Sequence, residues 1–70
     1  MNRLDEQVGL QIRLHRSLKG VRQDELAHEI GLKPGQLAAI EDGKWRAGAS
    51  KLFQIGRALR VPVSSFFASP

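Results

Sequence analysis

The chain has 70 residues, no cysteine, and eleven lysine and arginine residues against seven acidic ones, for a formal net charge of +4. This length allows one domain, expected over residues 1–70, and the lack of cysteine excludes disulfides and cysteine-ligated metal sites. No apolar run reaches the roughly 20 residues of a membrane span, and the N-terminus lacks the hydrophobic region of a signal peptide, so we expect a cytoplasmic protein without a membrane partner.

Glycine and proline divide the chain into short segments, none of which alternates like a strand, so we expect an all-α fold of five short helices. The first helix is predicted over residues 4–19 and ends at Gly20, a common helix stop. Its inward face is expected to carry Leu4, Val8, Ile12 and Leu18.

The next two helices are predicted over residues 23–30 and 34–42. Gly31 ends the earlier one, with an expected positive φ. Pro34 favours a helix start, because proline is best tolerated at the first helical position, and Gly43 ends that helix. A fourth helix is predicted over residues 49–59, before a last short turn that carries Phe66 and Phe67.

Residues 23–42 have the spacing of a helix-turn-helix unit. Two helices that cross steeply at a short turn need a small side chain at their closest approach and a glycine at the turn. Ala27 and Gly31 meet these two needs. The outer side of the second helix of such a unit stays free, and its shape fits the major groove of B-DNA. The positive net charge suits a polyanionic partner.

A set of positions spread over most of the chain strengthens this interpretation. The set comprises Gly9, Ile12-Arg13, Arg16, Gly20-Val21, Gln23 to Ala27, Ile30 to Leu32, Ile40 to Gly43 and Ala58 to Val61. Through them, residues 8–67 resemble the Cro/phage-repressor (XRE-like) family of helix-turn-helix regulators. The resemblance implies a compact, lambda-repressor-like DNA-binding domain with five helices.

The resemblance also implies site residues. Base reading is expected from the start of the third helix and one position a turn later, at Pro34, Gly35, Gln36 and Ala39. Phosphate contacts are expected from Gln23, Arg22, Lys33, Lys44 and Arg46. Gln23 is also expected to brace the recognition helix, or else it is an ordinary residue at a helix start. The alternative for Lys44 and Arg46 is a solvated basic loop. Arg16 and Glu41 match a family pair that joins the first helix to the end of the third as a largely buried salt bridge.

The expected base readers offer few polar groups. Gln36 can pair with adenine through two hydrogen bonds, whereas Pro34, Gly35 and Ala39 offer only apolar contact to a thymine methyl group. Specificity is therefore modest or comes from DNA shape.

The chain departs from the family pattern at three further positions. Arg22 and Lys33 stand where the family has Ser or Thr helix caps, and losing a good cap typically costs about 1 kcal/mol. The carboxylate of Asp42 would repel phosphate unless Lys44 or Arg46 absorbs its charge.

Three further side chains carry expectations of their own. Trp45 is expected to pack on the fourth helix, with the sugar-phosphate backbone or a dimer surface as alternatives. Lys51 is expected to meet an anionic neighbour, or a phosphate if the start of the fourth helix faces DNA, and His15 to be a surface histidine. The apolar tail is expected to contribute both to the core, with Phe53 and Leu59, and to a face for a second subunit. Its members are Val61, Val63, Phe66 and Phe67.

We expect a sequence-specific regulator, a repressor, that binds a palindromic operator in double-stranded DNA as a homodimer, with the third helix in the major groove. It would associate with the nucleoid. We expect no catalytic residue, metal, cofactor or small-molecule substrate, because the chain has no pattern typical of an enzyme. The alternative is a protein-interaction module of the antitoxin or partner-regulator type, favoured by Pro34-Gly35 and Asp42.

Overall fold

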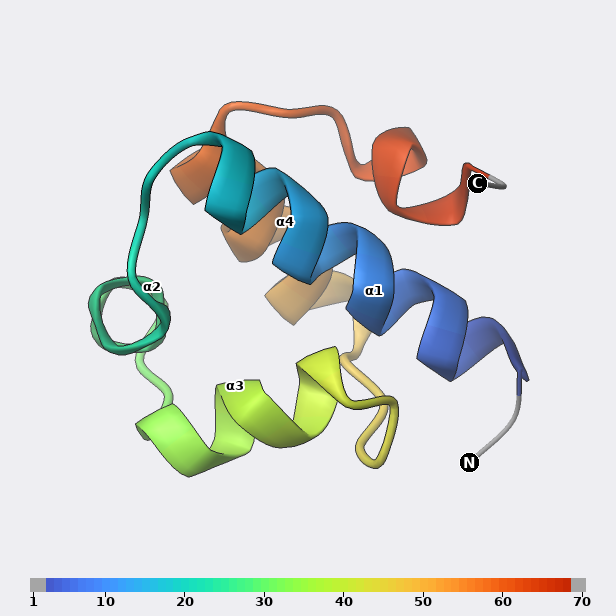
Figure 1. The fold of residues 1–70 in the computed structure, drawn as a ribbon, viewed down its shortest axis with the longest axis horizontal. Helices are drawn as coiled ribbons and strands as arrows, with labels where there is room; N and C mark the ends of the chain where they lie inside the picture. Colours follow the sequence, from blue (N-terminus) through green and yellow to red (C-terminus); the bar gives the residue numbers. More distant parts are fainter. Residues whose placement is uncertain (1–2, 69–70) are drawn as a thin grey trace.

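The chain folds into four α-helices and a 3₁₀ helix (Figure 1). The computed structural model describes residues 3–68, so both ends of the expected range 1–70 lie outside the described residues. The elements are α1 (Arg3–Leu18), α2 (Gln23–Glu29), α3 (Pro34–Glu41), α4 (Ala49–Leu59) and η1 (Val63–Phe67). Residues 3–68 contain no strand, and each α-helix begins and ends within one residue of its predicted bounds.

The prediction of five helices is wrong at the last element, which is a 3₁₀ turn after four α-helices. After Pro62 the chain forms a 3₁₀ helix, in which the Ser65 amide donates to the Pro62 carbonyl at 2.9 Å. A segment of five residues holds hardly more than one turn, and the 3₁₀ pattern is common in such short pieces. This turn still carries Phe66 into the core, where its ring meets that of His15 edge to face at 5.9 Å. His15 is therefore partly buried and packed, instead of a surface histidine.

The core receives side chains from every element. Its buried members are Val8, Ile12, Leu26, Ala27, Ile30, Leu37, Ile40, Leu52, Ile55, Leu59 and Phe66. Three residues predicted to point inward are exposed instead: Leu4, Leu18 and Phe53, at 50%, 71% and 65%. The two leucines lie near the ends of α1, which at about 24 Å is twice as long as α3. Phe53 lies on the outer side of α4.

Two small residues and a turn glycine permit the close packing around α3. Ala27 is fully buried, and Gly31 has a φ of 73°, as the helix-turn-helix spacing predicts. Gly9, which the sequence analysis placed only in the family pattern, lies at the crossing of α1 and α3. A β-carbon there would be 2.4 Å from the carbonyl oxygen of Ile40 and 2.6 Å from that of Glu41. Backbone atoms cannot yield as a flexible side chain would, so only glycine fits this crossing.

Substitution of Gly9 therefore tests the packing of α1 on α3. We expect Gly9→Ala to lower the free energy of unfolding by about 1–3 kcal/mol, as overpacking does. The control is Gly35→Ala, because no heavy atom lies within 4 Å of a β-carbon there; it should raise stability by about 0.4–1 kcal/mol through the unfolded state. Urea denaturation of both variants measures the difference, and equal stability for the two would contradict the close crossing.

Candidate nucleic-acid interface

α3 presents one side to the core and one to solvent. Leu37 and Ile40 are buried at 0% and 2% exposure, whereas the residues of the first turn are exposed and Ala39, a turn later, is partly buried. The exposed residues of this turn are Pro34, Gly35 and Gln36, preceded by Lys33. The structure thus brings the expected base readers to one end and side of α3, along the lower edge of the molecule in Figure 1.

Gln36 has a structural role at the start of α3. Its Oε1 accepts a hydrogen bond from the backbone amide of Lys33 at 2.9 Å, which is the return half of a capping box. The bond holds the side chain beside the helix start. The oxygen keeps a second lone pair and Nε2 keeps its hydrogens, so the amide group remains able to pair with an adenine edge.

The start of α2 is capped in a similar way. Arg22 makes no side-chain cap, but Glu25 Oε1 accepts from the Arg22 amide at 2.9 Å and Asp24 Oδ1 accepts from the Glu25 amide at 3.0 Å. These bonds replace part of what a Ser or Thr cap supplies. The Arg22 guanidinium is 74% exposed and pairs with Asp24 at 3.3 Å, so its charge is partly neutralised.

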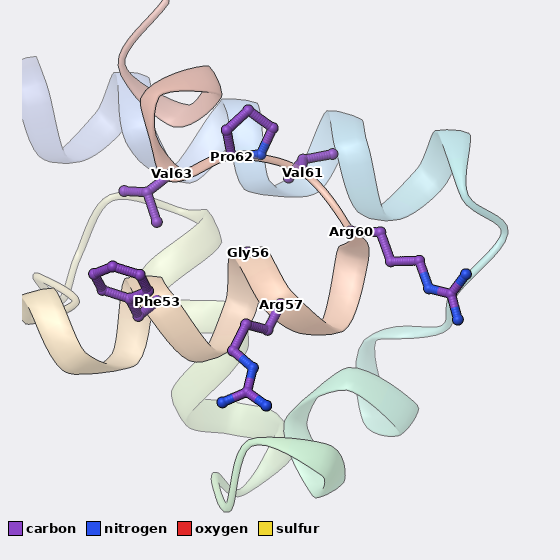
Figure 2. Close-up of a pocket in the computed structure, with 7 residues that line it drawn as sticks. All are labelled: Phe53, Gly56, Arg57, Arg60, Val61, Pro62 and Val63. Atoms are coloured by element: carbon purple, nitrogen blue, oxygen red, sulfur yellow. The ribbon is translucent and has the colours of Figure 1, made fainter.

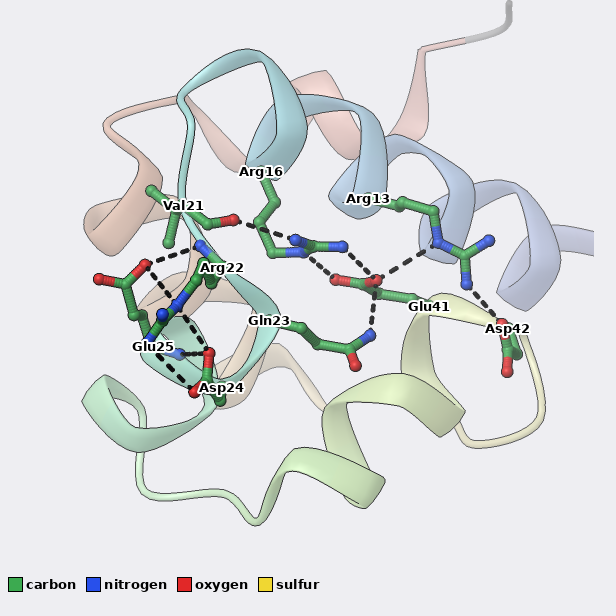
Figure 3. A network of polar contacts seen from close by, with 9 residues as sticks. All are labelled: Arg13, Arg16, Val21, Arg22, Gln23, Asp24, Glu25, Glu41 and Asp42. Carbon is green, nitrogen blue, oxygen red and sulfur yellow. Dashed lines mark hydrogen bonds and ion pairs between the residues drawn. The ribbon is translucent and has the colours of Figure 1, made fainter.

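A buried carboxylate joins three helices (Figure 3). The Glu41 side chain is fully buried, and its Oε2 accepts from Arg16 Nε at 2.7 Å. Its Oε1 accepts from Arg16 Nη2 at 3.1 Å and from Gln23 Nε2 at 3.0 Å. Arg16 also donates to the carbonyl of Val21 at 3.0 Å. The end of α3, the last turn of α1 and the start of α2 are therefore held by one network, in which Gln23 braces α3.

Arg13 is a member of this network that the sequence analysis missed. Its Nε lies 3.3 Å from Glu41 Oε1, and its Nη2 donates to Asp42. The hydrogen bond with Asp42 raises the pKa of Arg13, and Glu41 adds to this rise. Arg13, not Lys44 or Arg46, thus neutralises Asp42. The available signal was spacing, since Arg13 precedes Arg16 by three residues on the same helix.

The remaining expected phosphate ligands differ in their surroundings. Arg46 Nε lies 3.0 Å from Asp5 Oδ1 in α1, although the Arg46 side chain is 65% exposed, and this hydrogen bond raises the pKa of Arg46. Lys33 and Lys44 are exposed, and within residues 3–68 no ion pair engages either side chain. These two lysines, one before α3 and one after it, are the readily available cations around this helix.

Two further side chains lie in the loop after α3 and at the start of α4. Trp45 leaves 43% of its surface exposed, so it is partly covered. Lys51 Nζ donates to the carbonyl of Ile30 at 2.8 Å, so its partner is the negative end of α2 and not an acidic side chain. In the part of the chain that the structure describes, no group of three acidic or histidine side chains could hold a metal ion. No helix in that part is long and apolar enough to cross a membrane.

Comparisons with known proteins agree with this geometry. The family model described as helix-turn-helix matches residues 11–66. An uncharacterized HTH-type transcriptional regulator of Sinorhizobium medicae is 42% identical over 66 residues, which are 94% of this chain and 48% of that protein. The clp gene regulator ClgR from Corynebacterium glutamicum superposes with a TM-score of 0.90 at 30% identity, over 94% of this chain and 85% of its own. The hypothetical transcription factor NHTF from Neisseria gives 0.87 at 30% identity, over 96% and 77%. The chain spans about half the length of the Sinorhizobium relative.

The Glu41 network yields a stability prediction. Glu41→Ala strands Arg16 and releases Gln23, so we expect a loss of about 3–5 kcal/mol in the free energy of unfolding. The neighbouring change Asp42→Asn breaks a pair whose side chains are 43% and 44% exposed, and it should cost less than about 1 kcal/mol. Urea denaturation compares the two; a loss from Glu41→Ala as small as that from Asp42→Asn would show that the network does not hold α3.

Proposed function

This chain belongs to the helix-turn-helix family of Cro/phage-repressor-type transcriptional regulators, and we propose that it is a sequence-specific repressor that places α3 in the major groove of a palindromic operator. The observation that carries the proposal is the exposed first turn of a helix whose other end is held by a buried carboxylate. A reading helix held in this way loses little conformational freedom on binding.

The cations around α3 suit contacts to the phosphate backbone. Lys33 and Lys44 stand at its two ends without an ion pair in the described part of the chain. Arg22 pairs with an exposed Asp24, and exchanging such a pair for a phosphate costs little. Arg46 is exposed, but its partner Asp5 is buried, so Arg46 would contact a phosphate while keeping that pair. Gln23 Nε2 carries two hydrogens, of which Glu41 takes one, so the other remains for a phosphate oxygen. These contacts give affinity and register without reading sequence.

Base reading rests on Gln36, supported by three small neighbours. The Gln36 amide meets N6 and N7 of an adenine while its oxygen also holds the start of α3. Pro34, Gly35 and Ala39 let the helix approach the groove closely and touch thymine methyl groups. The protein-interaction alternative loses one of its supports, because Arg13 neutralises Asp42 and removes its repulsion of phosphate.

We infer the dimer interface from an apolar area at one end of the molecule, which we call the terminal patch. Leu4, Ala47 and Phe67 line one shallow hollow there, and Leu4 and Phe67 are exposed at 50% and 46%. The described ends of the chain and the loop after α3 lie in the right half of Figure 1, which is the end of the molecule that carries the patch. A two-fold axis through the patch would put both α3 helices on one face, as reading grooves about 34 Å apart requires. Burying the patch would also stabilise a small domain.

The DNA-binding proposal is tested by selection from a randomised duplex pool at moderate salt, followed by fluorescence anisotropy on the recovered sequence. Gln36→Ala should weaken binding to that sequence by about 1–3 kcal/mol and leave the salt dependence unchanged. Lys44→Ala should weaken binding to all sequences and lower the slope of log K against log salt by about 1. Lys19→Ala removes the same charge from the end of α1 and should change neither. If no sequence motif is recovered, the DNA-binding proposal is contradicted and the protein-interaction alternative is favoured.

The dimer is tested by size-exclusion chromatography with light scattering, which measures the molar mass of the protein in solution. We expect Phe67→Glu to shift the mass from dimer to monomer, because a charge would be buried without a partner. Leu14→Glu is the matched control, since Leu14 is 49% exposed on α1 but does not line the patch. A monomeric wild-type protein, or a dimer that persists in Phe67→Glu, would refute the terminal patch as the interface.

A further inference from the structure

A groove runs between the outer side of α4 and the segment that follows it (Figure 2). We call it the α4 groove. Its lining residues are Phe53, Gly56, Arg57, Arg60, Val61, Pro62 and Val63. Gly56 lets the two walls approach, because a β-carbon there would be 2.9 Å from the carbonyl oxygen of Val61. None of the lining residues belongs to α3 or to the loop after it, so the groove is separate from the candidate DNA interface.

The apolar part of the groove exposes a large side chain to solvent. Phe53 is 65% exposed, and across from it Val61 and Val63 are partly buried against the core. Pro62 adds an exposed apolar ring between the valines. Figure 2 shows the Phe53 ring and Val63 on opposite sides of the groove. An aromatic ring left in this position is suited to receive an apolar anchor from a partner.

The rim of the groove is cationic. Within residues 3–68 no ion pair engages the exposed side chains of Arg57 and Arg60, in contrast to Arg13, Arg16 and Arg46, which all contact carboxylates. Both guanidinium groups extend away from the backbone in Figure 2. Two arginines beside an apolar floor complement a partner that carries acidic side chains next to its apolar anchor.

Arg60 occupies a backbone position that favours glycine. Its φ is 58°, in the left-handed region, whereas the turns at Gly20, Gly31 and Gly43 use glycine for the same sign of φ. A residue with a side chain is strained there, and such strain is concentrated at functional sites. Arginine at a turn where glycine would be unstrained therefore indicates that the Arg60 side chain has a role.

We propose that the α4 groove binds an acidic protein segment with an apolar anchor, and that it does so while α3 is free to engage DNA. A second copy of this chain fits less well, because a two-fold axis over the groove would bring Arg57 and Arg60 against their own counterparts. Duplex DNA fits less well too, because the Phe53 floor offers nothing to a phosphate backbone.

A random peptide library displayed on phage, selected against the wild-type protein, tests this proposal. We expect recovered peptides to carry an apolar residue flanked by aspartate or glutamate. Fluorescein-labelled copies of these peptides should bind the Phe53→Ala variant about tenfold or more weakly than the wild-type protein. The double variant Arg57→Glu/Arg60→Glu should show a loss of the same size. Such a loss corresponds to the removal of one strong contact. Arg3→Glu reverses an exposed charge outside the groove and should not weaken binding. Selection against the double variant should recover basic peptides.

A further variant separates binding from folding. Arg60→Gly should raise the melting temperature by relieving the strained backbone and still weaken binding of the acidic peptides. Recovery of peptides without acidic residues, or undiminished binding to the double variant, would overturn the proposal. So would competition by duplex DNA for the same residues, or a change from dimer to monomer in Phe53→Ala, because each would assign the groove to a different partner.

Discussion

The structure depends on one buried carboxylate. Glu41 ends α3 with a fully buried side chain, and a charge in that position is tolerated only when it is paired and hydrogen-bonded. The donors come from α1 and α2, so satisfying the charge also sets where α3 lies. Gly9 makes the arrangement possible, because it lets α1 approach the carbonyl groups at the end of α3. A buried ion pair of this kind adds little stability over an apolar core. Its effect here is to hold α3 in one orientation.

The surface divides into parts according to which cations are already paired. Arg13 and Arg16 are used inside the fold, whereas Lys33 and Lys44 beside α3 have no ion pair in the described part of the chain. The hollow of the terminal patch includes Arg46 from the loop after α3, whereas no residue that lines the α4 groove lines that hollow or belongs to α3. An acidic partner would therefore not compete with DNA or with a second subunit for the same residues. In a chain of 70 residues this separation requires that nearly every helix serves the core on one side and a partner on another.

The sequence predicted the helices well because their ends have local causes. Gly31 and Pro34 act through backbone geometry alone, and the predicted bounds were within one residue. The identity of the inward residues was harder to predict on α1. This helix has apolar residues on two sides, with Val8 and Ile12 buried and Leu10, Leu14 and Leu18 exposed, and spacing alone does not say which side another element covers. The partners of Asp42, Arg46 and Lys51 were missed for a related reason, because each depends on how elements distant in sequence pack. The pairing of Arg16 with Glu41 and the bracing role of Gln23 were predicted, and both predictions came from the family resemblance.

We propose that α3, held by Glu41, is the element that meets DNA. The most direct test is to assign the backbone amide resonances of the protein and titrate it with a duplex recovered by selection. We expect the largest shifts at the amides of Lys33, Gly35, Gln36 and Leu37, smaller ones near Gln23 and Lys44, and no change at the residues of the α4 groove. Shifts centred on Phe53 to Val63, with α3 unaffected, would contradict it.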